Sequence, residues 1–134
     1  MSIDVEKKGE GLGLAVVIDD EPMVRDLLVV ALEELELRVL TAETGGEARQ
    51  VFSETNEAIA LVLLDLGLPD VQAGELFDEL REQAPAAKYV LISGYGEVEA
   101  RARFGREGIE AFLQKPFRIE TLFGLVEKLL PSTS

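Results

Sequence analysis

Side chains able to do chemistry follow four of the five apolar segments along the chain. Two adjacent carboxylates follow the first segment, one carboxylate the third, a hydroxyl the fourth and an amine the fifth. These residues are Asp19 and Asp20, Asp65, Ser93 and Lys115. If the segments are parallel strands, their carboxyl ends meet at one edge of a sheet, where open α/β proteins keep their sites. The spacing therefore predicts one cluster of acids with a hydroxyl and a lysine.

Three clustered carboxylates would repel one another by roughly 4 kcal/mol per close pair at an effective dielectric constant of about 20. Such a cluster usually raises a carboxylate pKa or holds a cation. The chain has no His and no Cys, and oxygen ligands suit a hard ion such as Mg²⁺, which keeps several waters. A lysine and a hydroxyl facing the same point indicate that an anion also arrives. A phosphoryl group meets both requirements, and Asp65 is then the candidate nucleophile.

The pattern of apolar residues predicts the elements that position this cluster. The segment 61–65 has four consecutive apolar residues before its acid, which is typical of a strand buried on both faces. Strands are expected at 14–18, 38–42, 61–65, 89–92 and 111–113, and helices at 22–35, 45–56, 74–84, 98–107 and 119–130. This alternation predicts an α/β fold, a flavodoxin-like (βα)5 doubly wound parallel sheet with strand order 2-1-3-4-5. That order makes the first and third strands neighbours.

Length and composition exclude several classes of protein. The 134 residues predict one domain at 14–131, with a flexible lead-in at 1–13 and a tail at 132–134. The net charge of −13 argues against binding nucleic acid or an anionic membrane surface. Without histidine, the chain is neither a histidine kinase nor a histidine phosphotransfer protein. It shows no signal-peptide core and no bilayer-spanning run, so a cytoplasmic location is expected.

Four motifs between residues 14 and 130 resemble the receiver domain of two-component response regulators. In chain order they are Val16-Val17-Ile18-Asp19-Asp20-Glu21-Pro22, Leu63-Leu64-Asp65-Leu66-Gly67-Leu68-Pro69, Leu91-Ile92-Ser93-Gly94 and Phe112-Leu113-Gln114-Lys115-Pro116-Phe117. Each motif alone is weak, but the four together, in order and at this spacing, are specific. The form Ser93-Gly94-Tyr95-Gly96 also resembles receivers attached to hybrid sensor kinases.

The resemblance implies a role for each residue of the cluster. Asp65 would be the phosphoacceptor, taking a phosphoryl group from a phosphohistidine on a histidine kinase or a histidine phosphotransfer protein. Asp20 would bind Mg²⁺ directly and Asp19 through water. Asp65 and the backbone carbonyl of Gly67 would be further ligands. Lys115 would pair with a phosphoryl oxygen.

Two further residues match the family's switch. Ser93 would bind the phosphoryl group through its hydroxyl, and Phe112 matches the aromatic side chain that swings inward on activation. The peptide bond between Lys115 and Pro116 is often cis in this family. Such a domain is a signalling module rather than an enzyme, because it promotes only its own phosphoryl transfer and dephosphorylation. The resemblance leaves open the downstream effector, homodimerisation on activation, and whether this is a stand-alone receiver or part of a hybrid kinase.

The chain departs from the family pattern in one loop. The glycine of the third helix usually follows the phosphoacceptor by eight residues, whereas Gly74 follows Asp65 by nine, as if one residue were inserted around 71–73. We expect this loop to differ in shape and the chemistry to be unchanged. Gly67 and Tyr95 occupy variable positions that tune phosphoryl lifetime in the family.

Two alternative functions fit parts of the sequence. A receiver-like docking module that is never phosphorylated would have the same fold, although such proteins commonly lose one residue of the cluster. A magnesium phosphohydrolase with an aspartyl nucleophile would carry the motif Asp-x-Asp after its first strand. Here the acids Asp19 and Asp20 are adjacent, and the candidate nucleophile follows the third strand.

Overall fold

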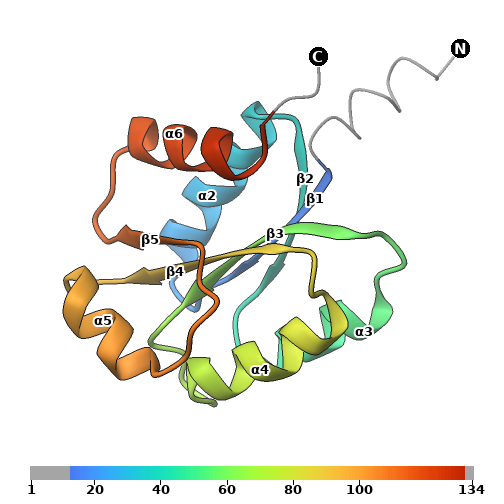
Figure 1. Cartoon of the computed structure of the whole chain (residues 1–134). Helices are drawn as coiled ribbons and strands as arrows, with labels where there is room; N and C mark the ends of the chain where they lie inside the picture. The colour runs from blue at the N-terminus through green and yellow to red at the C-terminus, as the bar shows by residue number, and fades with distance from the viewer. Residues whose placement is uncertain (1–12, 132–134) are drawn as a thin grey trace, which may run out of the picture.

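A five-stranded parallel sheet lies between two layers of helices in the computed structural model, which describes residues 13–131 (Figure 1). The strands are β1 (Gly13–Ile18), β2 (Leu37–Ala42), β3 (Ile59–Asp65), β4 (Lys88–Ser93) and β5 (Ala111–Gln114). The helices are α2 (Pro22–Glu34), α3 (Gly45–Glu54), α4 (Ala73–Gln83), α5 (Glu97–Phe104) and α6 (Ile119–Leu129). The strand order is β2-β1-β3-β4-β5, and every neighbouring pair is parallel. The predicted fold class and strand order are confirmed.

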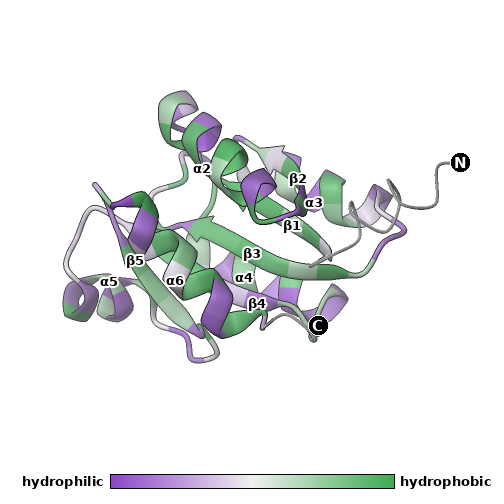
Figure 2. Ribbon diagram, turned by 90° about the horizontal axis from the view of Figure 1, so that it is seen from above, coloured by the Kyte–Doolittle hydropathy of each residue, from purple (hydrophilic) through white to green (hydrophobic). Residues whose placement is uncertain are grey.

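Successive residues of the central strands pack against opposite helix layers. Val62 and Leu64 belong to a cluster with α3, α4 and α5, whereas Leu61 and Leu63 belong to a cluster with α2 and α6. All four side chains are fully buried. Because both faces of β3 are covered, its sequence must be continuously apolar rather than alternating. Figure 2 shows β3 coloured as hydrophobic over most of its length, between helices whose purple residues are hydrophilic.

The ends of several elements differ from the sequence-based expectation. Helix α5 ends at Phe104 and does not reach Glu107. Gly13 opens β1, while the rest of the expected lead-in and the tail, 1–12 and 132–134, lie outside the described residues. Thr44 caps α3 as predicted, because its Oγ1 accepts a hydrogen bond from the Glu47 amide at 3.1 Å. Among the helices of residues 13–131, none has the length and apolar character to span a membrane.

Helix α5 has little contact with the core. Only Ala100 and Phe104 are buried, at the positions that face the sheet. Its charged side chains pair within the helix, Glu97 with Arg101 at 2.8 Å and Glu99 with Arg103 at 2.9 Å. These exposed pairs are four residues apart and contribute only about 0.3–0.5 kcal/mol each. The helix is therefore held mainly by the burial of these two side chains.

The start of α4 and the end of α5 touch at Gly74. A Cβ atom on residue 74 would lie 2.6 Å from the backbone oxygen of Phe104, which is closer than Cβ atoms come to other atoms in folded proteins. Gly124 on α6 is the opposite case, because a Cβ there would meet nothing within 4 Å. The first glycine permits a close approach of two backbones, and the second only weakens its helix.

We expect Gly74→Ala and Gly124→Ala to change stability in opposite directions. The first should lower the free energy of unfolding by about 1–3 kcal/mol, because backbone must move to admit the methyl group. The second should raise it by about 0.5–1 kcal/mol through helix propensity alone. Urea denaturation of the two variants measures both values, and a stabilised Gly74→Ala protein would contradict the close contact.

Candidate functional site

The carboxyl ends of β1 and β3 bring three acids together. Asp65 is the last residue of β3, and Asp19 and Asp20 follow β1 directly. The strands pair with Ile18 opposite Leu64, so both chains leave the sheet at the same level. One carboxylate oxygen from each acid lies within 4.8 Å of the others. The predicted meeting of these three carboxylates is therefore present in the fold.

Lys115 reaches this cluster from the end of β5. Its Nζ lies 2.9 Å from Asp19 Oδ2 and 3.4 Å from Asp65 Oδ1. It lies 2.6 Å from Oε1 of Glu21, a residue that the sequence analysis did not single out. Burial lowers the pKa of Lys115, but its bonds to Glu21 and Asp19 outweigh burial, and the pKa is raised overall. The lysine thus stays a cation.

Glu21 was not among the predicted site residues, although it belongs to the first motif. It is the N-cap residue of α2, yet its side chain makes no capping hydrogen bond. Instead its carboxylate binds Lys115, and its amide donates to Asp19 Oδ1 at 2.8 Å. The only available signal was its position next to Asp19 and Asp20.

The acids are crowded enough to perturb the central one. Burial raises the pKa of Asp65 to about 6, the charge of Asp19 adds to this, and Lys115 only partly opposes it. Asp19 is fully buried, and its Oδ2 accepts no well-aligned hydrogen bond from the described residues although the Lys115 ammonium is 2.9 Å away. A buried carboxylate oxygen in this state, with two more carboxylates beside it, fits a hard cation with oxygen ligands.

Ser93 forms another wall of the site at the end of β4. It is buried, and its Oγ accepts a hydrogen bond from the Tyr95 amide at 2.9 Å. Its backbone oxygen accepts from the Lys115 amide at 2.8 Å, which fixes the ends of β4 and β5 together. The Lys115–Pro116 bond is cis, as expected. Ser93, Lys115, Asp20 and Asp65 all line one cavity of about 1030 Å³.

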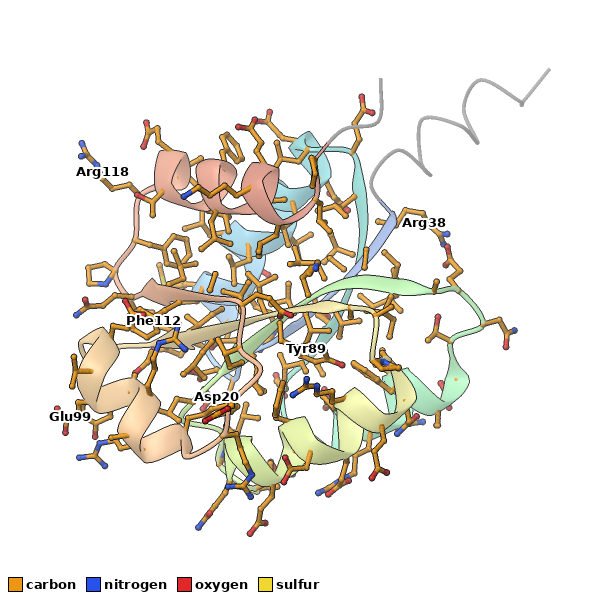
Figure 3. The ribbon with its side chains drawn as sticks, viewed as in Figure 1. Asp20, Arg38, Tyr89, Glu99, Phe112 and Arg118 are labelled. Atoms are coloured by element: carbon orange, nitrogen blue, oxygen red, sulfur yellow. The ribbon has the colours of Figure 1, made fainter. Side chains whose placement is uncertain are left out.

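Of the two remaining predicted site residues, Gly67 and Phe112, only the first lines this cavity. Gly67 lines it, and its amide lies 3.4 Å from Asp65 Oδ1. Phe112 does not line it: this half-buried residue of β5 packs against the core on the side of α3, α4 and α5. Figure 3 labels Phe112 on β5 and Asp20 toward the ends of α4 and α5. The acids, hydroxyl and amine are assembled, whereas the aromatic residue lies outside the cavity.

Comparisons with known proteins show the family of the chain. Residues 15–127 match the model of the response regulator receiver domain family, and the chain belongs to that family. It therefore has a phosphoacceptor role in two-component signalling. Its fold is the one found in solved receiver domains.

Two solved structures and one curated relative illustrate the similarity. A receiver domain from Methanospirillum hungatei is 28% identical with a TM-score of 0.77, covering 88% of this chain and 94% of that one. The response regulator TrrA of Thermotoga maritima, solved in complex with Mg²⁺ and BeF, is 31% identical with a TM-score of 0.74, covering 88% of this chain and 99% of that one. The sensor kinase CckA of Brucella abortus is 33% identical over 94% of this chain, which spans only 14% of the kinase.

The raised pKa of Asp65 predicts how stability changes with pH in the absence of divalent cations. The folded state binds a proton on Asp65 up to about pH 6, whereas the unfolded chain releases it near the ordinary value of 3.8. Stability should therefore fall as pH rises from about 4 to about 6, and Asp65→Asn should remove this contribution. At pH 7 in EDTA, we expect the variant to be more stable by on the order of 3 kcal/mol. Urea denaturation at pH 4.5 and 7 measures this, and an equal gain at both values would contradict the assignment.

Proposed function

We propose that Asp65 accepts a phosphoryl group from a phosphohistidine on a histidine kinase or a histidine phosphotransfer protein. The observation that supports this most strongly is that Asp65, Asp20 and Lys115 line one cavity, with the buried Asp19 directly beside Asp65 and Lys115. A cytoplasmic location fits such partners. The domain would act on no other substrate and would promote only its own phosphorylation and dephosphorylation.

The same residues fit a Mg²⁺ ion. Asp20 and Asp65 would bind it through carboxylate oxygens, Asp19 through water and Gly67 through its backbone carbonyl. The buried Asp19 Oδ2 supports this, and so does the pKa of Asp65, which burial raises and the charge of Asp19 raises further while Lys115 only partly opposes both. Bound Mg²⁺ would offset the charge of these acids and of the phosphoryl oxygens.

The chain's own groups would then perform the transfer. A carboxylate oxygen of Asp65 forms a bond to phosphorus as the bond between phosphorus and the donor imidazole nitrogen breaks. The electron pair of that bond remains on the imidazole. Lys115, 3.4 Å from Asp65 Oδ1 and fixed by its contact with Asp19, is positioned to pair with a phosphoryl oxygen. Burial of Asp65 limits access of water to the acyl phosphate that forms.

Ser93 and Phe112 would report phosphorylation to the surface. The Ser93 hydroxyl accepts from the Tyr95 amide, which leaves its own hydrogen available to donate to a phosphoryl oxygen. Phe112 lies on β5, the strand next to the one that ends at Ser93. An inward movement of its side chain would change the face formed by α5, β5 and α6. Phosphorylation would thus shift an equilibrium between two surface states and change which effector protein binds.

A docking module that is never phosphorylated is disfavoured by the site. Such a module needs none of these groups, yet Asp65, Ser93 and Lys115 line one cavity and the buried Asp19 contacts Lys115. Keeping unneutralised acids buried costs stability, which a surface used only for docking would not require.

We expect acetyl phosphate to label the protein at Asp65 in the presence of Mg²⁺. Labelling should vanish in EDTA and in Asp65→Asn, because the first removes the cation and the second the nucleophile. Asp26→Asn is a matched control, since Asp26 is an exposed acid of α2 outside the cavity. Intact-mass measurement detects the added phosphoryl group. Full labelling of Asp65→Asn would overturn the assignment of the nucleophile.

We expect Ser93→Ala to separate labelling from switching. The variant keeps Asp65 and Lys115 and should still acquire a phosphoryl group, whereas the resonances of Phe112 and its neighbours on β5 should shift much less than in the native protein. Beryllium fluoride with Mg²⁺ serves as a stable phosphoryl mimic for NMR comparison. Equal shifts on β5 in both proteins would show that Ser93 does not transmit the signal.

A further inference from the structure

The loop between β3 and α4 is fastened to the first turn of α3. Asp70 Oδ1 accepts a hydrogen bond from the Gly45 amide at 2.8 Å, and Oδ2 accepts one from the Gly46 amide at 3.1 Å. These amides hold the pKa of Asp70 below its ordinary value, because they bond to its ionised form. This is the loop in which the chain has one residue more than the family pattern between Asp65 and Gly74.

Helix α3 does not need Asp70 in order to begin. Thr44 Oγ1 already accepts from the Glu47 amide at 3.1 Å, and Glu47 Oε1 accepts from the Glu43 amide at 2.8 Å. This local arrangement is close to a capping box, which is a sufficient helix start by itself. The two bonds from Asp70 come from 24 and 25 residues away. Their main consequence is therefore to fix the position of the loop.

Packing at Gly45 supports the same attachment. A Cβ atom on residue 45 would lie 2.3 Å from Val71 Cγ1 and 3.3 Å from Asp70 Oδ1. Val71 is partly buried and packs against the core on that side of the sheet. The next glycine is not constrained in this way, since a Cβ on Gly46 would have no neighbour closer than 3.8 Å. The absence of a side chain at Gly45 thus leaves the space that Val71 of the loop occupies.

The fastened loop includes the part of the site that no strand positions. The Leu66 amide still bonds to the Ile92 oxygen at 2.9 Å, so the sheet fixes the chain up to that residue. Gly67 follows, exposed and with its amide 3.4 Å from Asp65 Oδ1, and Leu68 is buried. Asp70 is the next residue that hydrogen bonds hold to another element. Gly67 therefore lies between the Leu66 hydrogen bond to the sheet and the Asp70 hydrogen bonds to α3.

We propose that Asp70 is a positioning residue of the phosphoryl site, and that its bonds to the first turn of α3 hold the Gly67 carbonyl where a metal ion can use it. The inference rests on the proposed function in so far as it assigns Gly67 to the Mg²⁺ site. It adds that the first turn of α3, which itself contributes no side chain to the cavity lining, determines the affinity of that site.

Two substitutions remove the attachment in different ways. Asp70→Asn keeps the shape of the side chain but replaces one accepting oxygen with an NH₂ group, which faces an amide that also donates. Gly45→Ala changes no charge and displaces Val71 by contact. The matched controls are Glu82→Gln, which removes one charge from an exposed acid of α4, and Gly46→Ala, which adds the same methyl group where it fits.

Calorimetric titration with MgCl₂ and hydrogen exchange in EDTA are the measurements. Both attachment variants should bind Mg²⁺ about tenfold more weakly than the native chain, an effect typical of losing an outer-shell contact. The amides of Gly67 and Leu68 should exchange faster without metal, while the β1 and β3 amides remain protected. Both controls should match the native protein in affinity and exchange.

The outcomes separate this inference from the proposed function. Native Mg²⁺ affinity in Asp70→Asn and Gly45→Ala, with only a lowered melting temperature, would show that the attachment is structural and would overturn the inference alone. Weakened binding in Asp70→Asn but not in Gly45→Ala would assign the effect to charge and would also overturn it. A native chain that does not bind Mg²⁺ would remove the proposed metal site and this inference together.

Discussion

The contact between Lys115 and the strand-end acids is the interaction on which the rest of the site depends. The ammonium touches Asp19 at the end of β1 and Asp65 at the end of β3, while its own backbone amide bonds to Ser93 at the end of β4. The residue that directly follows the edge strand β5 therefore joins the ends of β4, β3 and β1. Because parallel strands end at the same level, a single side chain can span these distances.

That contact neutralises only part of the charge it touches. Four carboxylates, those of Asp19, Asp20, Glu21 and Asp65, surround or adjoin the single ammonium. Burial and, after it, the charge of Asp19 outweigh the neighbouring cation, so the pKa of Asp65 stays raised. The cost must be met by the rest of the fold, and the two apolar layers of the sheet, each sealed by helices, supply the stability to do so. The apolar run of β3 before Asp65 thus serves the site as well as the core.

The sequence predicted the features that depend on strand periodicity and failed for those that depend on loop geometry. Asp19, Asp65, Ser93 and Lys115 could be placed because each ends or follows a buried strand, and the strand order then determines which ends are adjacent. Glu21 could not be placed, since its role follows from the direction of its side chain rather than from its position in an element.

The attachment through Asp70 escaped sequence reasoning for a related reason. Its partners are backbone amides on another element, and amides leave no mark in the residue types of the chain. The count of residues between Asp65 and Gly74 showed that the loop was longer, without showing which way it folds. Helix ends were shifted by a few residues for a similar reason, because caps and frayed turns depend on contacts beyond the local pattern.

Helix α5 has a consequence for how receivers of this kind diversify. Its outward side chains pair with each other, Glu97 with Arg101 and Glu99 with Arg103, and only Ala100 and Phe104 are buried. Duplicated copies of such a domain can therefore exchange nearly the whole outer surface of the helix while the fold and the acid cluster stay intact. Substitutions on that surface cost the fold little, and under the proposed function, in which α5 belongs to the face that changes on phosphorylation, they alter recognition without altering the chemistry. The same property would help to insulate parallel signalling pathways from one another.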